Sequence, residues 1–269
     1  MRNRFTILSV SLLVAALRAE LKVETPEYAN MGAQLQGYLV YDDAVTEPRP
    51  GVLIVHEWWG LTDHTRATAR RVAEMGYVAF ALDMYGKDVV TDQVPRAAEL
   101  SGQFKERPTL LRARAAAGLQ QLARHPKVDP QRIAAIGFCF GGSTVLQLAY
   151  DGAPVRGVIS FHGNPVTPLP KDGEIQARIL VLHGADDPLV PGEALMAFQD
   201  AMRARKLDWQ LISYGNAVHS FTNPGADKVG IAGVAYDRRT DERAWRHARD
   251  FFNELFQAPA ASAPAHAQP

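Results

Sequence analysis

The segment RIAAIGFCFGGSTVLQLAY, from Arg132 to Tyr150, contains the only cysteine of the chain, Cys139. Gly137 and Gly141 stand two residues away on either side, which is the spacing of a nucleophile elbow, a turn usually built around serine. Such an elbow holds its nucleophile on a strained bend between a strand and a helix, and small neighbours let the chain fold back. The amides that begin the helix favour a thiolate or an oxyanion beside them. The pattern favours a reactive thiol over a buried filler side chain.

A nucleophile of this kind needs a base and an acid, which in this architecture follow it in the order nucleophile, acid, histidine. His219 lies in a loop rich in Gly, Asn and Ser, where mobile catalytic histidines are found, so we expect it to be the base. His183 ends an apolar run and His247 falls within an amphipathic pattern, so structural roles suit them better. Asp186 and Asp187 compete as the acid, although either could instead cap the helix that follows. We prefer Asp187.

Short apolar runs alternate with helical patterns along the middle of the chain, and no repeat or long linker divides it. This predicts an α/β fold with a single doubly wound, mostly parallel sheet and helices on both faces. The runs expected to form strands, most of them nearly continuous in apolar residues, are 51–56, 77–82, 132–137, 157–161, 178–183 and 209–214. Ligands bind such sheets at the carboxyl ends of the strands. The polar side chains expected together at that edge are Glu57, Asp83, Cys139, His162, Asp187 and His219.

The composition limits the class of partner. The chain has 269 residues, of which 47% are hydrophobic and 22% charged, so it can bury one large core or two small ones. Its formal net charge is zero with both signs interspersed, which gives no reason to expect nucleic acid or an anionic membrane as partner. No Cys/His cluster with metal-ligand spacing and no phosphate-binding loop is found in the sequence, so we expect no metal and no organic cofactor.

The two ends of the chain differ from the middle. Residues 1–19 have two arginines near their start, then an apolar run, and small residues near Ala16 and Ala19. This is the layout of a cleaved secretory signal. The run is short for a bilayer span, and a buried helix or an uncleaved anchor is the alternative. We therefore predict a secreted or periplasmic protein whose single α/β domain covers residues 20–257. The Ala/Pro-rich residues 258–269 are predicted to be a disordered tail.

The segments GFCFGG, DPLVP and HSF, with HEWWG upstream, together resemble the dienelactone hydrolase family of α/β-hydrolases. The resemblance covers most of residues 30–256 and implies the α/β-hydrolase fold. It also implies roles for six residues: Cys139 as nucleophile, Asp187 as the acid that orients the base, His219 as base, Glu57 as regulator of the thiol, and the backbone amides of Phe140 and Trp58 as oxyanion hole.

Glu57 has a physical role within this scheme. A carboxylate close to a thiol raises the pKa of the thiol, so Glu57 would keep the resting Cys139 neutral and protected from oxidation until substrate displaces the carboxylate. The alternative is that Glu57 pairs with Arg66 or Arg70 and never meets the sulfur.

The resemblance also bears on the substrate. In dienelactone-cleaving members, arginines after the DMY and HSF segments hold the substrate carboxylate, whereas the matching residues here are Lys87 and Asn223. We therefore expect weak carboxylate recognition and a preference for neutral esters or lactones. Trp58 and Trp59 are interpreted as pocket wall, with ordinary core packing as the alternative for one of them. The side chains expected to contact the substrate are Trp59, Tyr85, Lys87, His162, Phe221 and Asn223.

These observations predict hydrolysis of a small ester or lactone through a thioester on Cys139, with His219 first assisting thiolate formation and later activating water. Two other functions stay open. The thiol could serve a redox or electrophile-scavenging protein, or the fold could be a scaffold that only binds a ligand. The sequence predicts neither the actual substrate nor the oligomeric state.

Overall fold

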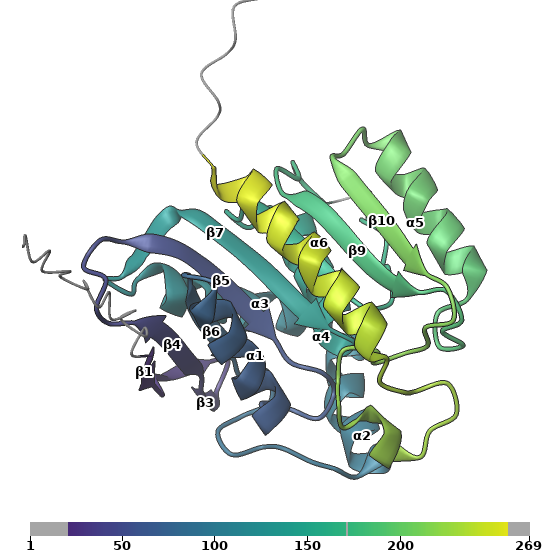
Figure 1. The fold of residues 1–269 in the computed structure, drawn as a ribbon, viewed down its shortest axis with the longest axis horizontal. Helices are drawn as coiled ribbons and strands as arrows, with labels where there is room; N and C mark the ends of the chain where they lie inside the picture. Colours follow the sequence, from purple (N-terminus) through teal and green to yellow (C-terminus); the bar gives the residue numbers. More distant parts are fainter. Residues whose placement is uncertain (1–20, 171, 258–269) are drawn as a thin grey trace, which may run out of the picture.

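An eight-stranded sheet forms the centre of the molecule in the computed structural model, which describes residues 21–170 and 172–257 (Figure 1). The predicted signal segment and the predicted tail lie outside the described residues. The strands follow the order β1, β4, β6, β5, β7, β8, β9, β10. Their bounds are Leu21–Glu24, Tyr38–Asp42, Val78–Leu82, Arg49–Val55, Val128–Phe138, Gly157–Phe161, Arg178–Gly184 and Trp209–Tyr214.

Six strands run parallel to one another and coincide with the six predicted apolar runs: β6, β5, β7, β8, β9 and β10. The doubly wound, mostly parallel sheet is therefore confirmed. The antiparallel part was not predicted. It comprises β1 and β4 at one edge of the sheet and a separate hairpin of β2, Glu27–Asn30, and β3, Ala33–Gln36.

Helices cover both faces of the sheet because its side chains alternate between two apolar layers. Val52 and Ile54 of β5 pack toward α1, Asp63–Glu74, and α6, Arg238–Phe256, whereas Leu53 and Val55 pack toward the opposite layer. The helices of that opposite layer are α2, Val94–Glu106, α3, Pro108–Ala123, α4, Phe140–Tyr150, and α5, Gly192–Ala204. In Figure 1, α1 and α6 lie in front of the sheet, with α3 and α4 behind it.

The parallel strands place their carboxyl ends along one edge, where the loops after β5, β7, β9 and β10 meet. The loop after β10 contains a short helix, η1, Ala226–Val229, before the chain enters α6. Among the helices that the structure describes, none has the length and apolar character needed to cross a membrane.

Candidate active site

Cys139 occupies the tight turn between β7 and α4. Its backbone is in a strained region, with φ 52° and ψ −113°. Two hydrogen bonds hold this conformation: its N–H donates to the carbonyl of Phe161 at 3.0 Å, and its carbonyl accepts from the N–H of Gly142 at 3.0 Å. A Cβ at Gly137 would overlap the carbonyl of Gly141, so the turn closes only with glycine there. The chain thus has the geometry of a nucleophile elbow with sulfur at its tip.

His219 and Asp187 form a buried pair close to this turn. The Nδ1 atom of His219 lies 2.7 Å from Oδ2 of Asp187, and the Asp187 side chain is 0% exposed. The second carboxylate oxygen of Asp187 accepts the N–H of Leu189 at 2.9 Å. Asp186, the competing candidate, is exposed to solvent. The structure therefore brings Asp187, and not Asp186, into contact with the predicted base.

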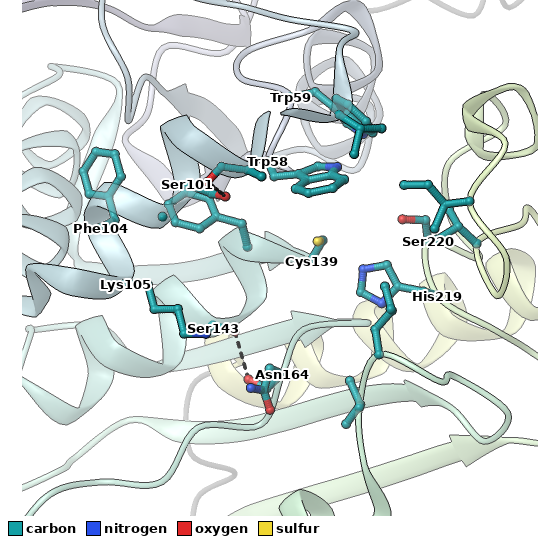
Figure 2. A pocket seen from close by; sticks show the side chains of 18 of the residues that line it. Trp58, Trp59, Ser101, Phe104, Lys105, Cys139, Ser143, Asn164, His219 and Ser220 are labelled. Carbon is teal, nitrogen blue, oxygen red and sulfur yellow. Dashed lines mark hydrogen bonds between the residues drawn. The ribbon is translucent and has the colours of Figure 1, made fainter. Parts of the chain in front are cut away.

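The surroundings of His219 favour its charged form. Burial acts to lower its pKa, but the charge of Cys139 and the hydrogen bond and charge of Asp187 outweigh burial and raise the pKa to about 10. The Cys139 sulfur lies near enough to raise the pKa of His219, but Nε2 makes no hydrogen bond to any residue that the structure describes. Cys139 and His219 are therefore adjacent without being aligned, and Figure 2 shows the sulfur beside the imidazole.

Two backbone amides are available near the sulfur. Phe140 begins α4, so its N–H has no acceptor within the helix. The Trp58 loop after β5 is held by the hydroxyl of Tyr85, which donates to the Trp58 carbonyl at 3.0 Å. Within the described part of the chain, neither the Trp58 nor the Phe140 N–H donates a hydrogen bond. Both amides remain free to bind an oxyanion.

Glu57 is buried and contacts the segment that carries the base. Its carboxylate accepts hydrogen bonds from Oγ of Ser220 at 3.1 Å and from Nδ2 of Asn223 at 2.6 Å. It pairs with neither candidate arginine: Arg66 binds Asp63 at 3.0 Å, and Arg70 lies over a tyrosine ring. The predicted regulator is therefore tied, in this structure, to two neutral side chains on the His219 loop.

A cavity of about 960 Å³ opens above Cys139. The predicted residues that line it are Trp58, Trp59, Cys139, Phe140, His219 and Asn223. Figure 2 shows the sulfur of Cys139 facing the space between Trp58 and His219. The predicted contacts that do not line it are Tyr85, Lys87, His162 and Phe221.

These four side chains are buried or hydrogen-bonded away from the cavity, as Tyr85 is through its bond to the Trp58 carbonyl. Lys87 binds Glu27 at 2.6 Å on the hairpin strand β2. His162 and Phe221 are fully buried, and Nε2 of His162 lies 2.8 Å from the hydroxyl oxygen of Thr222. The ring of His162 packs edge-on against His219, with centroids 5.4 Å apart, so it supports the His219 ring. Burial holds the pKa of His162 well below its usual value, which keeps this ring neutral.

Much of the cavity wall comes from residues that the sequence did not indicate. Helix α2 contributes Ser101, Phe104 and Lys105, and α4 contributes Ser143 and Gln147. Lys105 is the only lysine or arginine among the lining residues, and the wall is otherwise mostly apolar or neutral. These positions carry no motif because they are ordinary helical residues whose role depends only on how α2 packs beside the elbow.

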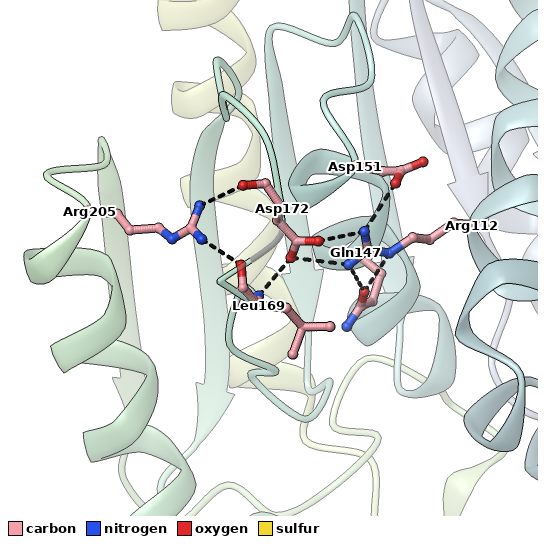
Figure 3. Close-up of polar contacts among 6 residues, drawn as sticks. All are labelled: Arg112, Gln147, Asp151, Leu169, Asp172 and Arg205. Atoms are coloured by element: carbon pink, nitrogen blue, oxygen red, sulfur yellow. Dashed lines mark hydrogen bonds and ion pairs between the residues drawn. The ribbon is translucent and has the colours of Figure 1, made fainter.

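Arg112 on α3 fixes part of this wall (Figure 3). Its Nε donates to the Gln147 side-chain oxygen at 2.9 Å, and its Nη1 donates to Asp172 at 2.7 Å and to Asp151 at 3.0 Å. The Asp172 side chain is 1% exposed, so this ion pair is shielded from solvent. The guanidinium thereby joins α3, α4 and the segment after β8 into one support beneath the cavity.

No group of three or more His, Cys, Asp or Glu side chains with metal-binding geometry occurs among residues 21–170 and 172–257.

Known proteins resemble this chain in sequence and fold. The model of the dienelactone hydrolase family matches residues 35–256. A crystal structure of a dienelactone hydrolase-like promiscuous phosphotriesterase from metagenomic libraries is 40% identical and superposes with a TM-score of 0.86, covering 88% of this chain and 99% of that one. An uncharacterised protein of Caenorhabditis elegans is 39% identical over 151 residues, which are 54% of this chain and 94% of that protein. A dienelactone hydrolase of Anabaena variabilis, 18% identical with a TM-score of 0.62, covers 87% of this chain and 98% of its own, and supports the fold alone.

Proposed function

Because the chain belongs to the dienelactone hydrolase family, we propose that it is a hydrolase that cleaves a small carboxylic ester or lactone through a thioester on Cys139. The observation that carries this proposal is the strained elbow of Cys139 beside the buried His219–Asp187 pair, at the floor of a large cavity. Nucleophile, base and orienting acid follow the chain order of α/β-hydrolases.

Acylation begins at the sulfur. The Cys139 thiolate attacks the substrate carbonyl carbon, and the carbonyl electron pair moves onto oxygen, where the amides of Phe140 and Trp58 stabilise it. The intermediate collapses by breaking the bond to the alcohol oxygen. His219, held charged by Asp187, donates its Nε2 proton to that oxygen. The products are a free alcohol, or the ring-opened hydroxyl of a lactone, and a thioester.

Deacylation reverses these roles. Neutral His219 accepts a proton from water as the water oxygen attacks the thioester carbonyl, and the same amides bind the second oxyanion. Collapse expels the Cys139 thiolate and releases the carboxylic acid. The imidazolium then again faces the thiolate, and Asp187 stabilises its charge throughout the cycle.

The cavity favours neutral substrates. Most of its lining is apolar, and Lys105, its one lysine, is exposed on a flexible stem. Lys87 and Asn223 stand where the resemblance places carboxylate-binding arginines. Lys87 is paired with Glu27, and Asn223 offers a neutral amide that already donates to Glu57. We therefore propose that uncharged short-chain esters or lactones are preferred over carboxylated ones.

A phosphotriester is a second candidate substrate, favoured by the 40% identity to a promiscuous phosphotriesterase and by the volume and apolar lining of the cavity. The same thiolate would attack phosphorus, and the same two amides would stabilise the oxygen of the phosphoryl group. Hydrolysis of diethyl p-nitrophenyl phosphate tests this candidate: Cys139-dependent turnover supports it, and no turnover under conditions where a carboxylic ester is cleaved rejects it.

The main proposal is tested with p-nitrophenyl acetate as substrate. We expect steady-state turnover by the wild type, loss of at least about a thousandfold in kcat for Cys139→Ala, and little change for Ser143→Ala, which removes a hydroxyl from the same cavity wall. A redox protein or a binding scaffold would give no sustained turnover. Equal turnover by wild type and Cys139→Ala would exclude the cysteine as nucleophile.

A further inference from the structure

A second cavity, of about 620 Å³, lies between the β2–β3 hairpin and the junction of α2 with α3. The mechanism described above does not use it. It is lined by Met31, Gly32, Ala33, Tyr85, Gln103, Phe104, Glu106, Arg107, Pro108, Thr109, Leu110 and Arg114. Phe104 and Pro108 belong to the walls of both cavities, so the two spaces lie on either side of the same helix junction.

Arg114 is an unusual residue in this wall because its charge is buried and forms no ion pair, although the buried Asp83 carboxylate is near enough to act on it. The residue is 4% exposed, yet its guanidinium binds only neutral oxygens: Nε donates to the Asn30 side chain at 3.2 Å, and Nη1 donates to the Met84 carbonyl at 2.7 Å. Its Nη2 makes no hydrogen bond to any residue that the structure describes. A buried charge is costly unless it is paired. Nη2 is not among the buried unsatisfied atoms, so it is accessible and available to an anion in the cavity.

A second guanidinium faces the same space. Arg107 is the cap residue between α2 and α3, and both it and Arg114 line the cavity. The hydrogen bonds of the Arg107 guanidinium go only to the backbone and side chain of Gln103. Neither arginine has a carboxylate within ion-pair distance among residues 21–170 and 172–257. Glu106 supplies the one negative charge of the lining, which leaves two positive charges against one.

The beginning of α3 adds donors to these charges. Pro108 is the first residue of this helix of 16 residues, and the amides of Thr109 and Leu110 follow in the first turn, where no acceptor exists within the helix. Thr109 and Leu110 both line the cavity. Free amides at a helix start, combined with arginine forks, are the chemistry that binds carboxylate and phosphate oxygens.

We propose that this second cavity is a binding site for a small oxyanion, a carboxylate or a phosphate group, held by Arg114 and Arg107 at the start of α3. The planar guanidinium of Arg114 donates through Nη2, Arg107 supplies the second charge from the rim, and the first-turn amides of α3 complete the site. The volume accommodates an organic anion as well as an inorganic one.

Isothermal titration calorimetry of the full chain with inorganic phosphate, and separately with acetate, tests the site. We expect saturable binding of at least one of the two anions to the wild type, with one site per chain, and the anion that binds identifies the ligand class. Arg107→Gln should weaken binding by about tenfold, because a hydrogen bond to a charged group contributes at least that much. Arg96→Gln is the matched control: it removes an exposed α2 arginine that pairs with Glu99 outside the cavity and should leave the affinity unchanged.

Arg114→Lys keeps the charge but removes the fork, so it should also weaken binding if thermal unfolding shows that the variant folds. If that variant does not fold, Arg107→Gln decides alone, because Arg107 is exposed and makes only local contacts. Absence of saturable binding of both anions to the wild type would overturn the proposal. An Arg107→Gln variant that binds as tightly as the wild type would overturn it equally.

Discussion

Replacing Asp187 by asparagine removes one charge from the centre of the proposed triad and changes little else in size. The carboxylate is fully buried and lies 2.7 Å from Nδ1 of His219. Asp186, the neighbouring residue, is exposed and therefore provides a matched control with the same chemical change. The pair of variants separates the orienting acid from a general effect of charge in this loop.

The expected magnitude follows from this geometry. At an effective dielectric constant of about 20, unit charges about 2.7 Å apart interact by roughly 6 kcal/mol. Loss of that stabilisation from the His219 imidazolium corresponds to about a 10⁴-fold loss in rate, since each 1.36 kcal/mol is tenfold. An amide that donates to Nδ1 would also fix the wrong imidazole tautomer. We therefore expect Asp187→Asn to lower kcat/KM by about 10³- to 10⁴-fold.

The assay is initial-rate hydrolysis of p-nitrophenyl acetate, with circular dichroism to verify that each variant is folded. Asp186→Asn should stay within about twofold of the wild type, as expected for an exposed side chain without contact to the base. If Asp187→Asn keeps more than about a tenth of the activity, or if Asp186→Asn loses more than Asp187→Asn, the assignment of the acid is wrong.

Three further predictions concern selectivity, folding and processing. A neutral lactone should have a higher kcat/KM than its carboxylated analogue, because Asn223 offers no charge; a preference of more than about tenfold for the carboxylate, roughly 1.4 kcal/mol, would contradict this. Gly141→Ala should lower the free energy of unfolding by about 1–3 kcal/mol or more, because its Cβ would lie 2.6 Å from the His56 carbonyl. Urea unfolding measures this loss of stability. Gly102→Ala is the control: a Cβ there would meet nothing within 4 Å, so this variant should not lose stability. N-terminal sequencing of native protein should give a start shortly after Ala16 or Ala19; an intact Met1 in soluble protein would reject the signal.

The central strands could be predicted because doubly covered parallel strands have an unmistakable, nearly continuous apolar composition. The antiparallel strands at the start could not, since they are only four or five residues long. In addition, β1, β2 and β3 are largely exposed or half-buried and so lack an apolar run. The β2–β3 hairpin turns at Met31 and Gly32, both with positive φ. Asparagine before glycine is the usual signal for such a turn, and methionine at the first position hides it.

The elbow and the order of the proposed triad were predictable because steric demands and chain order are written directly in the sequence. The contacts of Glu57 were not, because its partners Ser220 and Asn223 lie 163 and 166 residues further along the chain. Lys87 was assigned to the substrate through the family resemblance, but Glu27 of the unpredicted hairpin binds it. Side-chain partners that come from distant segments require the folded structure.

Intact-protein and peptide mass spectrometry of enzyme quenched with acid during turnover of p-nitrophenyl acetate tests the thioester most directly. Acid preserves an acyl-enzyme that accumulates, and the mass of the labelled peptide identifies the residue that carries it. We predict one acetyl group per chain, located on Cys139, released on chasing with buffer and absent from Cys139→Ala. An acetyl group on Ser143, Ser220 or another residue, with Cys139 unmodified, would contradict the cysteine mechanism.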